Sequence, residues 1–243
     1  MRAILFDFGG TLDYPRHWLD RFLAHYHAAG VTISRSELDC AFDASTRTAY
    51  QNTHTLQGFG LARLIDYLVG LQIDELDQRG SGTVKDMLAG LDNGGRERLA
   101  RTIAGGFVAE SRNGLARSHV LLSGWSEHFK LGVVSNFYGN LDSILAEAGL
   151  APLFDAVADS CRVGIFKPDP GIFRAALDQL GTGEATGDTL MVGDSLDKDC
   201  APARRLGLKT VWLRHDGGTR PANADDAPDF TIEALEELND LKW

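Results

Sequence analysis

Cysteine is scarce in this chain, and long apolar runs are absent from it. Its 243 residues include three cysteines, none of which belongs to a CxxC pair: Cys40, Cys161 and Cys200. An odd number of widely spaced cysteines argues against a disulfide-stabilised secreted domain and favours a reducing compartment. No apolar run approaches the roughly 18 residues of a membrane span, and the N-terminal segment does not provide the apolar stretch of a secretory signal. We therefore expect a cytoplasmic protein that does not interact with a membrane.

Positive charge is also in short supply. The chain has 24 basic and 34 acidic residues, which gives a net charge of −10. Proteins that bind duplex nucleic acid normally carry a basic footprint, so nucleic acid is not an expected partner. An anionic substrate would instead need local positive charge or a bound cation. The sequence also lacks the GxxxxGK and GxSxG motifs, so it does not support P-loop nucleotide chemistry or an α/β-hydrolase triad.

Short apolar runs near both ends of the chain predict buried strands. They cover residues 3–8, 131–134, 156–158, 190–192 and 210–213, and helical patterns over residues 140–148, 171–180 and 196–206 lie between them. Alternation of this kind is typical of βαβ units with a parallel sheet. The first strand has no partner nearby in the sequence, so it most simply joins the later strands. The fold class that we predict is a doubly wound, Rossmann-like α/β core.

The middle of the chain has a helical pattern. Trp18, Phe22 and Tyr26 recur at every fourth position, as on one face of a helix. Ser34 and Glu37 have the spacing of a capping box, which predicts the start of a second helix. The three aromatic side chains are expected to lie in the core of a helical domain.

Apolar stripes predict two further helices over residues 59–71 and 96–108, and no strand-like alternation interrupts this region. We therefore predict two domains. Residues 1–13 and 119–243 form an α/β catalytic core, and residues 14–118 form an all-helical cap inserted after the first strand. The cap contains 12 basic and 12 acidic residues, so the whole net charge of −10 belongs to the core.

Polar side chains follow three of the predicted strands. Asp7 ends the first strand, Ser135 and Asn136 follow the second, and Asp194 follows the strand over residues 190–192. Because open parallel sheets bind ligands at the carboxyl ends of their strands, we expect these side chains to converge at one edge. Two carboxylates at such an edge suit Mg²⁺, which prefers one or two carboxylates together with waters and substrate oxygens.

Two consecutive glycines, Gly9 and Gly10, follow Asp7 and precede Thr11. A glycine turn is flexible, and its backbone N–H groups can approach an anion closely. Asp13, just beyond this turn, is interpreted as a solvated or capping residue, with a role as a catalytic acid as the alternative.

Four short motifs occur in order along the chain. They are DFGGTL from Asp7, VVSN from Val133, KPDP from Lys167 and GDSLDKD from Gly193. Together with a helical insertion between the first two, they resemble the motifs of the haloacid dehalogenase superfamily. The resemblance covers nearly all of the predicted core. It implies a Mg²⁺-dependent, phosphatase-like hydrolase of a phosphoric ester or acyl phosphate of a small molecule.

The resemblance also implies catalytic and metal-binding roles. Asp7 would be the nucleophile, forming an aspartyl-phosphate, and Lys167 would neutralise charge on it and on the transferring phosphoryl group. The metal ligands would be Asp7, Asp194 and the backbone carbonyl of Gly9. Asp199 would support the metal or orient Lys167.

Substrate-binding residues are implied in the same way. The hydroxyl groups of Thr11 and Ser135 would hold phosphoryl oxygens by hydrogen bonds. Gly10 and Asn136 complete the predicted substrate-binding set. Electrostatic positioning of this kind contributes most of the catalysis in phosphoryl transfer.

The chain departs from the family pattern at Gly9. Phosphatases of this superfamily usually have a second aspartate there, which acts as general acid and base. Its loss should reduce protonation of the leaving group and activation of water, a contribution of about 10²–10⁴-fold. One alternative is therefore a catalytically silent family member that binds a phosphorylated metabolite or a protein partner.

Haloacid dehalogenase and phosphonate hydrolase activities are the less favoured alternatives. Family dehalogenases need no metal and have small polar residues where this chain has Asp194, and a tyrosine where it has Phe173. Phosphonate cleavage needs a cap lysine, and Lys85 is the only lysine in the predicted cap. The seven histidines, His215 among them, are scattered, and we interpret them as solvated or packing residues.

Overall fold

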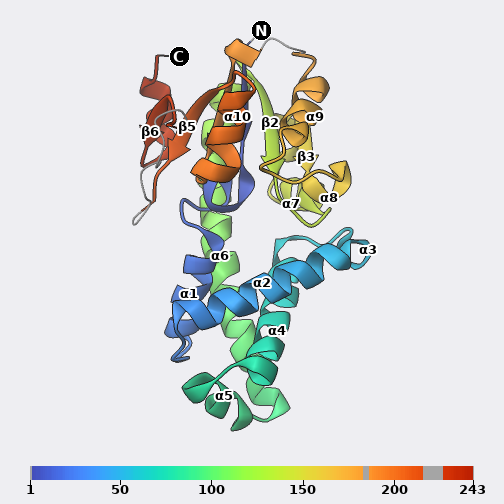
Figure 1. Ribbon diagram of the computed structural model, residues 1–243, viewed down its shortest axis with the longest axis vertical. Coiled ribbons are helices and arrows are strands. Elements are labelled where there is room, and N and C mark those ends of the chain that lie inside the picture. The colour runs from blue at the N-terminus through green and yellow to red at the C-terminus, as the bar shows by residue number, and fades with distance from the viewer. Residues whose placement is uncertain (1, 183–185, 216–226, 243) are drawn as a thin grey trace. The chain divides into compact units, whose positions relative to one another are not determined.

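The computed structural model describes residues 2–182, 186–215 and 227–242 and divides into two compact units. The α/β unit consists of Met1–His17 with Arg112–Trp243, and the helical unit is Trp18–Ser111 (Figure 1). A parallel sheet with helices and an inserted helical segment confirm the predicted fold class. Within the described ranges, we find no helix with both the length and the apolar character needed to span a membrane.

The described part of the α/β unit contains one six-stranded sheet in the order β3-β2-β1-β4-β5-β6. Its strands are β1 (Ala3–Phe6), β2 (Lys130–Ser135), β3 (Ala156–Asp159), β4 (Thr189–Gly193), β5 (Lys209–Leu213) and β6 (Phe230–Ile232). All neighbouring pairs are parallel. β1 is central because all four of its side chains are apolar and buried, as is typical of a strand covered on both faces.

Helices cover both faces of this sheet. They are α7 (Leu141–Glu147), α8 (Ser160–Val163), α9 (Gly171–Leu180), α10 (Ala201–Arg205) and the C-terminal part of α6 (Asn93–Ser126). Consecutive side chains of a strand point to opposite faces. Leu5 belongs to the same buried cluster as Phe173 of α9 and Ala203 of α10. Phe6 stacks on Trp125 of α6 with ring centroids 5.7 Å apart, so α6 packs on the other face.

The helical unit contains α1 (Trp18–Ala28), α2 (Arg35–Gln51), α3 (Thr53–Leu56), α4 (Leu61–Arg79), α5 (Gly82–Ala89) and the N-terminal part of α6. The predicted capping box is confirmed: the Glu37 N–H donates to Ser34 Oγ at 3.3 Å, and the Ser34 N–H donates to Glu37 Oε2 at 3.1 Å. The predicted aromatic core is also present, since Phe22 is fully buried and stacks on Phe107 of α6 at 4.3 Å.

The sequence underestimates α6, which was predicted only over residues 96–108. Glycine is a poor helix former, yet α6 continues through several glycines. Two of these glycines are sites of close packing. A Cβ on Gly106 would overlap the His25 ring, and one on Gly114 would overlap the backbone of Asp13. Residues 223–229, a polar and acidic stretch whose composition predicts a connecting loop, lie mostly outside the described residues.

Gln72 on α4 offers a test of the packing of the helical unit. Its side chain is fully buried, and among the residues that the structure describes neither its amide nitrogen nor its amide oxygen has a hydrogen-bond partner. We expect Gln72→Met to raise the free energy of unfolding by about 1–3 kcal/mol, because it removes the desolvation cost of an unsatisfied amide. Denaturant unfolding measures this. Gln78→Met, on an exposed position of the same helix, is the control and should change stability little; equal stability of the two variants would contradict the prediction.

Candidate functional site

The carboxyl ends of three central strands bring the predicted site residues together. In the parallel register Phe6 of β1 lies beside Val133 of β2 and Val192 of β4. Asp7 directly follows β1, and its backbone N–H donates to the carbonyl of Val192 at 2.9 Å. Ser135 is the last residue of β2, and Asp194 directly follows β4.

Asp7 is the centre of a buried hydrogen-bond network. Its Oδ1 accepts from the Ser135 hydroxyl at 2.9 Å and from Lys167 Nζ at 2.6 Å. Lys167 Nζ also donates to Asp199 Oδ1 at 2.6 Å. The side chains of Lys167, Asp7 and Asp199 are 3%, 8% and 1% exposed. Lys167 is therefore a buried cation that links two buried carboxylates.

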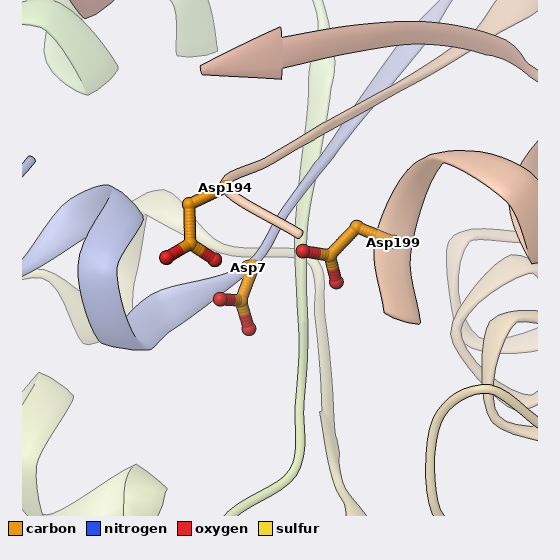
Figure 2. Close-up of side chains that lie close together, drawn as sticks. All are labelled: Asp7, Asp194 and Asp199. Atoms are coloured by element: carbon orange, nitrogen blue, oxygen red, sulfur yellow. The ribbon is translucent and has the colours of Figure 1, made fainter. Parts of the chain in front are cut away.

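A third carboxylate, that of Asp194, completes an acidic cluster (Figure 2). One ligand oxygen from each of Asp7, Asp194 and Asp199 lies within 4.8 Å of the others. Burial raises the pKa of Asp7 above its ordinary value; Lys167 opposes this rise, and Asp194 adds to it. Burial also raises the pKa of Asp199 to about 7 against the attraction of Lys167.

The donor set fits a hard divalent cation. Lys167 lies between the carboxylates of Asp199 and Asp7, which raise its pKa although burial alone would lower it. One lysine cation balances one of the three carboxylates, and buried charge of one sign is costly unless it is paired or coordinates a metal. Oxygen ligands at the end of a sheet are those that Mg²⁺ prefers.

Asn136, a predicted substrate-binding residue, contacts the backbone of Lys167 through both ends of its side-chain amide. The Lys167 N–H donates to Asn136 Oδ1 at 2.7 Å, and Asn136 Nδ2 donates to the Lys167 carbonyl at 3.0 Å. This reciprocal pair holds the Lys167 backbone beside the end of β2.

Asp159, at the end of β3, orders the segment after β2 and was missed from the sequence. Its carboxylate accepts from the backbone N–H groups of Gly139, Leu141 and Cys161 at 2.9, 3.2 and 3.0 Å. Burial raises its pKa, and these backbone hydrogen bonds oppose the rise. The position of this segment thus depends on a neighbouring strand that carries none of the four motifs.

The two glycines after Asp7 have different backbone requirements. Gly9 has φ −77° and ψ 116°, an ordinary conformation for any L-residue, whereas Gly10 has φ +88°. A Cβ on Gly10 would also overlap the Asp194 carboxylate. The Gly10 N–H donates to Oδ1 of Asp13 at 2.8 Å, and Asp13 is fully buried. Asp13 is therefore a capping residue of this turn and not a solvated one.

Two further predicted residues line the same region. Thr11 is 1% exposed, and its hydroxyl has no hydrogen-bond partner within the described residues. A buried hydroxyl of this kind is available to an oxygen of a ligand. Asp199 is held by the Ser195 N–H, which donates to its Oδ2 at 3.0 Å, and a Cβ on Gly193 would overlap the Asp199 carboxylate.

Trp212 and His215 are site residues that the sequence analysis missed. Trp212 Nε1, on β5, donates to the backbone carbonyl of Asp194 at 2.9 Å. His215 Nε2 lies 2.8 Å from the carbonyl oxygen of Gly10 and 3.7 Å from Asp194 Oδ2. His215 is two residues beyond Leu213, the end of β5. The expectation that site residues follow the carboxyl ends of parallel strands, extended to β5, would therefore have predicted it.

Comparison with known proteins gives matches over nearly the whole chain. The family model for haloacid dehalogenase-like hydrolases matches residues 1–207. Haloacid dehalogenase-like hydrolase domain-containing protein 3 of Danio rerio is 30% identical over 250 residues, which cover 98% of this chain and 95% of that protein. Phosphoserine phosphatase of Thermus thermophilus is 43% identical over 94 residues, or 39% of this chain and 36% of the enzyme.

Solved structures share the fold at low sequence identity. The HAD-hydrolase YfnB of Bacillus subtilis, solved with bound magnesium, is 20% identical, with a TM-score of 0.57 over 98% of this chain and 97% of that one. A dehalogenase solved as an intermediate complex is 18% identical, with a TM-score of 0.62 over 98% and 95% of the two chains. These likenesses describe the architecture alone.

Proposed function

This chain belongs to the haloacid dehalogenase-like hydrolase family, and we propose that it is a Mg²⁺-dependent hydrolase of a small phosphorylated molecule that reacts through an aspartyl-phosphate on Asp7. The observation that carries the proposal is the acidic cluster of Asp7, Asp194 and Asp199, in which the buried Lys167 contacts the carboxylates of Asp7 and Asp199. The phosphatases among the chain's relatives support the choice of a phosphorylated substrate.

In the proposed first step, a carboxylate oxygen of Asp7 attacks the phosphorus atom and the bond to the leaving oxygen breaks. Lys167 favours the ionised form of Asp7 and holds Oδ1 in place, and Ser135 donates to the same oxygen. The Thr11 hydroxyl, which has no hydrogen-bond partner within the described part of the chain, would donate to a phosphoryl oxygen. Water then attacks the aspartyl-phosphate, which releases phosphate and restores the Asp7 carboxylate.

The residues that would hold Mg²⁺ are Asp7, Asp194 and the backbone carbonyl of Gly9. The cation would supply positive charge against the phosphoryl oxygens and help to orient them. Asp199 contacts Lys167 and the backbone of Ser195, so its proposed role is to position Lys167. Asn136 has the same proposed role, through the Lys167 backbone.

Phe173 argues against a dehalogenase. The family's dehalogenases have a tyrosine at this position. Here Phe173 is fully buried in the apolar cluster that also contains Leu5 of β1 and Ala203 of α10. Gly9, in contrast, favours a second candidate, a silent family member that binds a phosphorylated molecule without turning it over. Gly9 has no side chain that could protonate a leaving group.

A substrate screen on the full chain tests these possibilities. Phosphate esters, acyl phosphates and haloacids are each incubated with Mg²⁺ and with excess chelator. We expect hydrolysis of at least one phosphorylated compound, lost in the chelator; haloacid turnover that persists in chelator would contradict the proposal. Beryllium fluoride, which mimics an aspartyl-phosphate, is added in a thermal denaturation assay. Stabilisation by it without any turnover would support the silent family member instead.

A further inference from the structure

Two side chains from distant parts of the sequence hold the peptide groups on either side of Gly10. Before it, the Gly10 N–H donates to Asp13 Oδ1 at 2.8 Å. After it, His215 Nε2 lies 2.8 Å from the Gly10 carbonyl oxygen. A carbonyl oxygen can only accept a hydrogen bond, so Nε2 of His215 carries the hydrogen and donates it.

These two contacts fix the direction of two neighbouring backbone groups. In a planar trans peptide the N–H and C=O bonds point in opposite directions. Because Asp13 holds the Gly10 N–H, the carbonyl of Gly9 must point away from the Asp13 carboxylate. Because His215 holds the Gly10 carbonyl, the N–H of Thr11 must point away from the imidazole ring. Both peptide groups flanking Gly10 are therefore oriented by side chains outside the turn.

The turn needs such contacts because it contains two consecutive glycines. Glycine has the largest backbone freedom of any residue, and Gly9 occupies the position where phosphatases of the family usually have an aspartate. The two contacts are also sheltered from water, since Asp13 is fully buried and the His215 side chain is 15% exposed.

His215 also connects the turn to the acidic cluster. The 3.7 Å from its Nε2 to Asp194 Oδ2 is too long for a hydrogen bond. It is short enough for the N–H dipole to act on the carboxylate. Gly10 lies against the same carboxylate, because a Cβ there would overlap it. A substitution of His215 should therefore alter both the backbone of the turn and the electrostatic environment of the Asp194 carboxylate.

We propose that Asp13 and His215 are positioning residues that clamp the Gly9–Gly10 backbone and hold the Gly9 carbonyl in one direction. The function of the clamp rests on the proposed function, in which that carbonyl is a ligand of Mg²⁺. Neither member of the clamp belongs to the four motifs: Asp13 directly follows the first of them, and His215 lies beyond the last.

Amide hydrogen exchange tests the clamp without metal or substrate. Wild type, His215→Ala and His215→Gln are compared in chelator, with His128→Ala as an exposed histidine control from the same unit. We expect the Gly10 and Thr11 amides to exchange about 5- to 10-fold faster in His215→Ala, the effect of one lost hydrogen bond. The Gln variant should recover most of the protection, because its amide N–H can reach the Gly10 carbonyl. Unchanged exchange in His215→Ala would overturn the clamp.

Calorimetric titration of the same four proteins with Mg²⁺ tests whether the clamp supports metal binding. We expect the Kd for Mg²⁺ to rise by about 10- to 100-fold in His215→Ala, to be largely restored in His215→Gln and to stay at the wild-type value in His128→Ala. A folded His215→Ala protein with wild-type Kd would overturn the positioning role. If the Ala variant does not fold, His215→Asn replaces it, because its shorter side chain does not reach Gly10. A wild-type protein that neither binds Mg²⁺ nor turns over substrate would refute the proposed function, while the exchange comparison would still decide the clamp.

Discussion

Asp7→Asn is expected to reduce hydrolysis of any substrate found for this protein by at least about 10⁴-fold, the scale of losing a catalytic nucleophile. An amide has neither the charge nor the nucleophilic oxygen that forms an aspartyl-phosphate. The loss should appear in kcat and should not be recovered by raising the Mg²⁺ concentration. Single-turnover kinetics with radiolabelled phosphate would also show whether a phosphoenzyme still forms.

The variant should remain folded, which separates a chemical effect from a structural one. Lys167 also donates to Asp199, so we expect it to keep a carboxylate partner when residue 7 is an asparagine. Removing one of three crowded carboxylates also relieves the repulsion from Asp194 that raises the pKa of Asp7. We therefore expect a free energy of unfolding equal to or above that of wild type. Asp197→Asn, an exposed carboxylate in the GDSLDKD motif, is the matched control and should keep full activity. Turnover retained by Asp7→Asn would refute the phosphoenzyme.

Local sequence patterns predicted most of the strands, because a strand buried on both faces has apolar residues at consecutive positions. The run from Ala3 to Phe6 is apolar at every position, which a strand covered on both faces requires. β6 was missed for the opposite reason. It is three residues long with a single buried side chain, that of Ile232, and a segment this short does not establish a period. Its position is set by pairing with β5, which a local pattern does not record.

The expectation that polar side chains after the strands converge at one edge brought Asp7, Ser135 and Asp194 close together, as the structure has them, but it could not assign hydrogen-bond partners. Asn136 follows β2 as expected, yet its amide contacts the Lys167 backbone. That pairing depends on where a segment 31 residues away lies. Trp212 and Asp159 were missed because each acts on the backbone of another segment. Contacts between a side chain and distant backbone have no sequence signature, whereas a carboxylate at the end of a buried strand has one.

The glycine at position 9 leads to the second large expected effect. With no acid there, the leaving oxygen must depart largely unprotonated or take its proton from water. The rate should then depend steeply on the pKa of the leaving group. Aryl and acyl phosphates should be hydrolysed, whereas alkyl phosphates such as sugar phosphates should react slowly. Gly9→Asp should raise the turnover of alkyl phosphates more than that of aryl phosphates, by up to about 10²–10⁴-fold.

The backbone of Gly9 permits this substitution. Its φ of −77° and ψ of 116° suit an aspartate, whereas the φ of +88° at Gly10 would strain any side chain. Gly9→Asn is the matched control, since it adds a side chain of the same shape without an acid. The slope of log kcat against leaving-group pKa, measured for all three proteins with Mg²⁺, should flatten in Gly9→Asp and stay steep in Gly9→Asn. A folded, Mg²⁺-binding Gly9→Asp protein with the wild-type slope would mean that another group already protonates the leaving oxygen. Asp13 is a poor choice for that group, because its carboxylate is fully buried and bound to the Gly10 N–H.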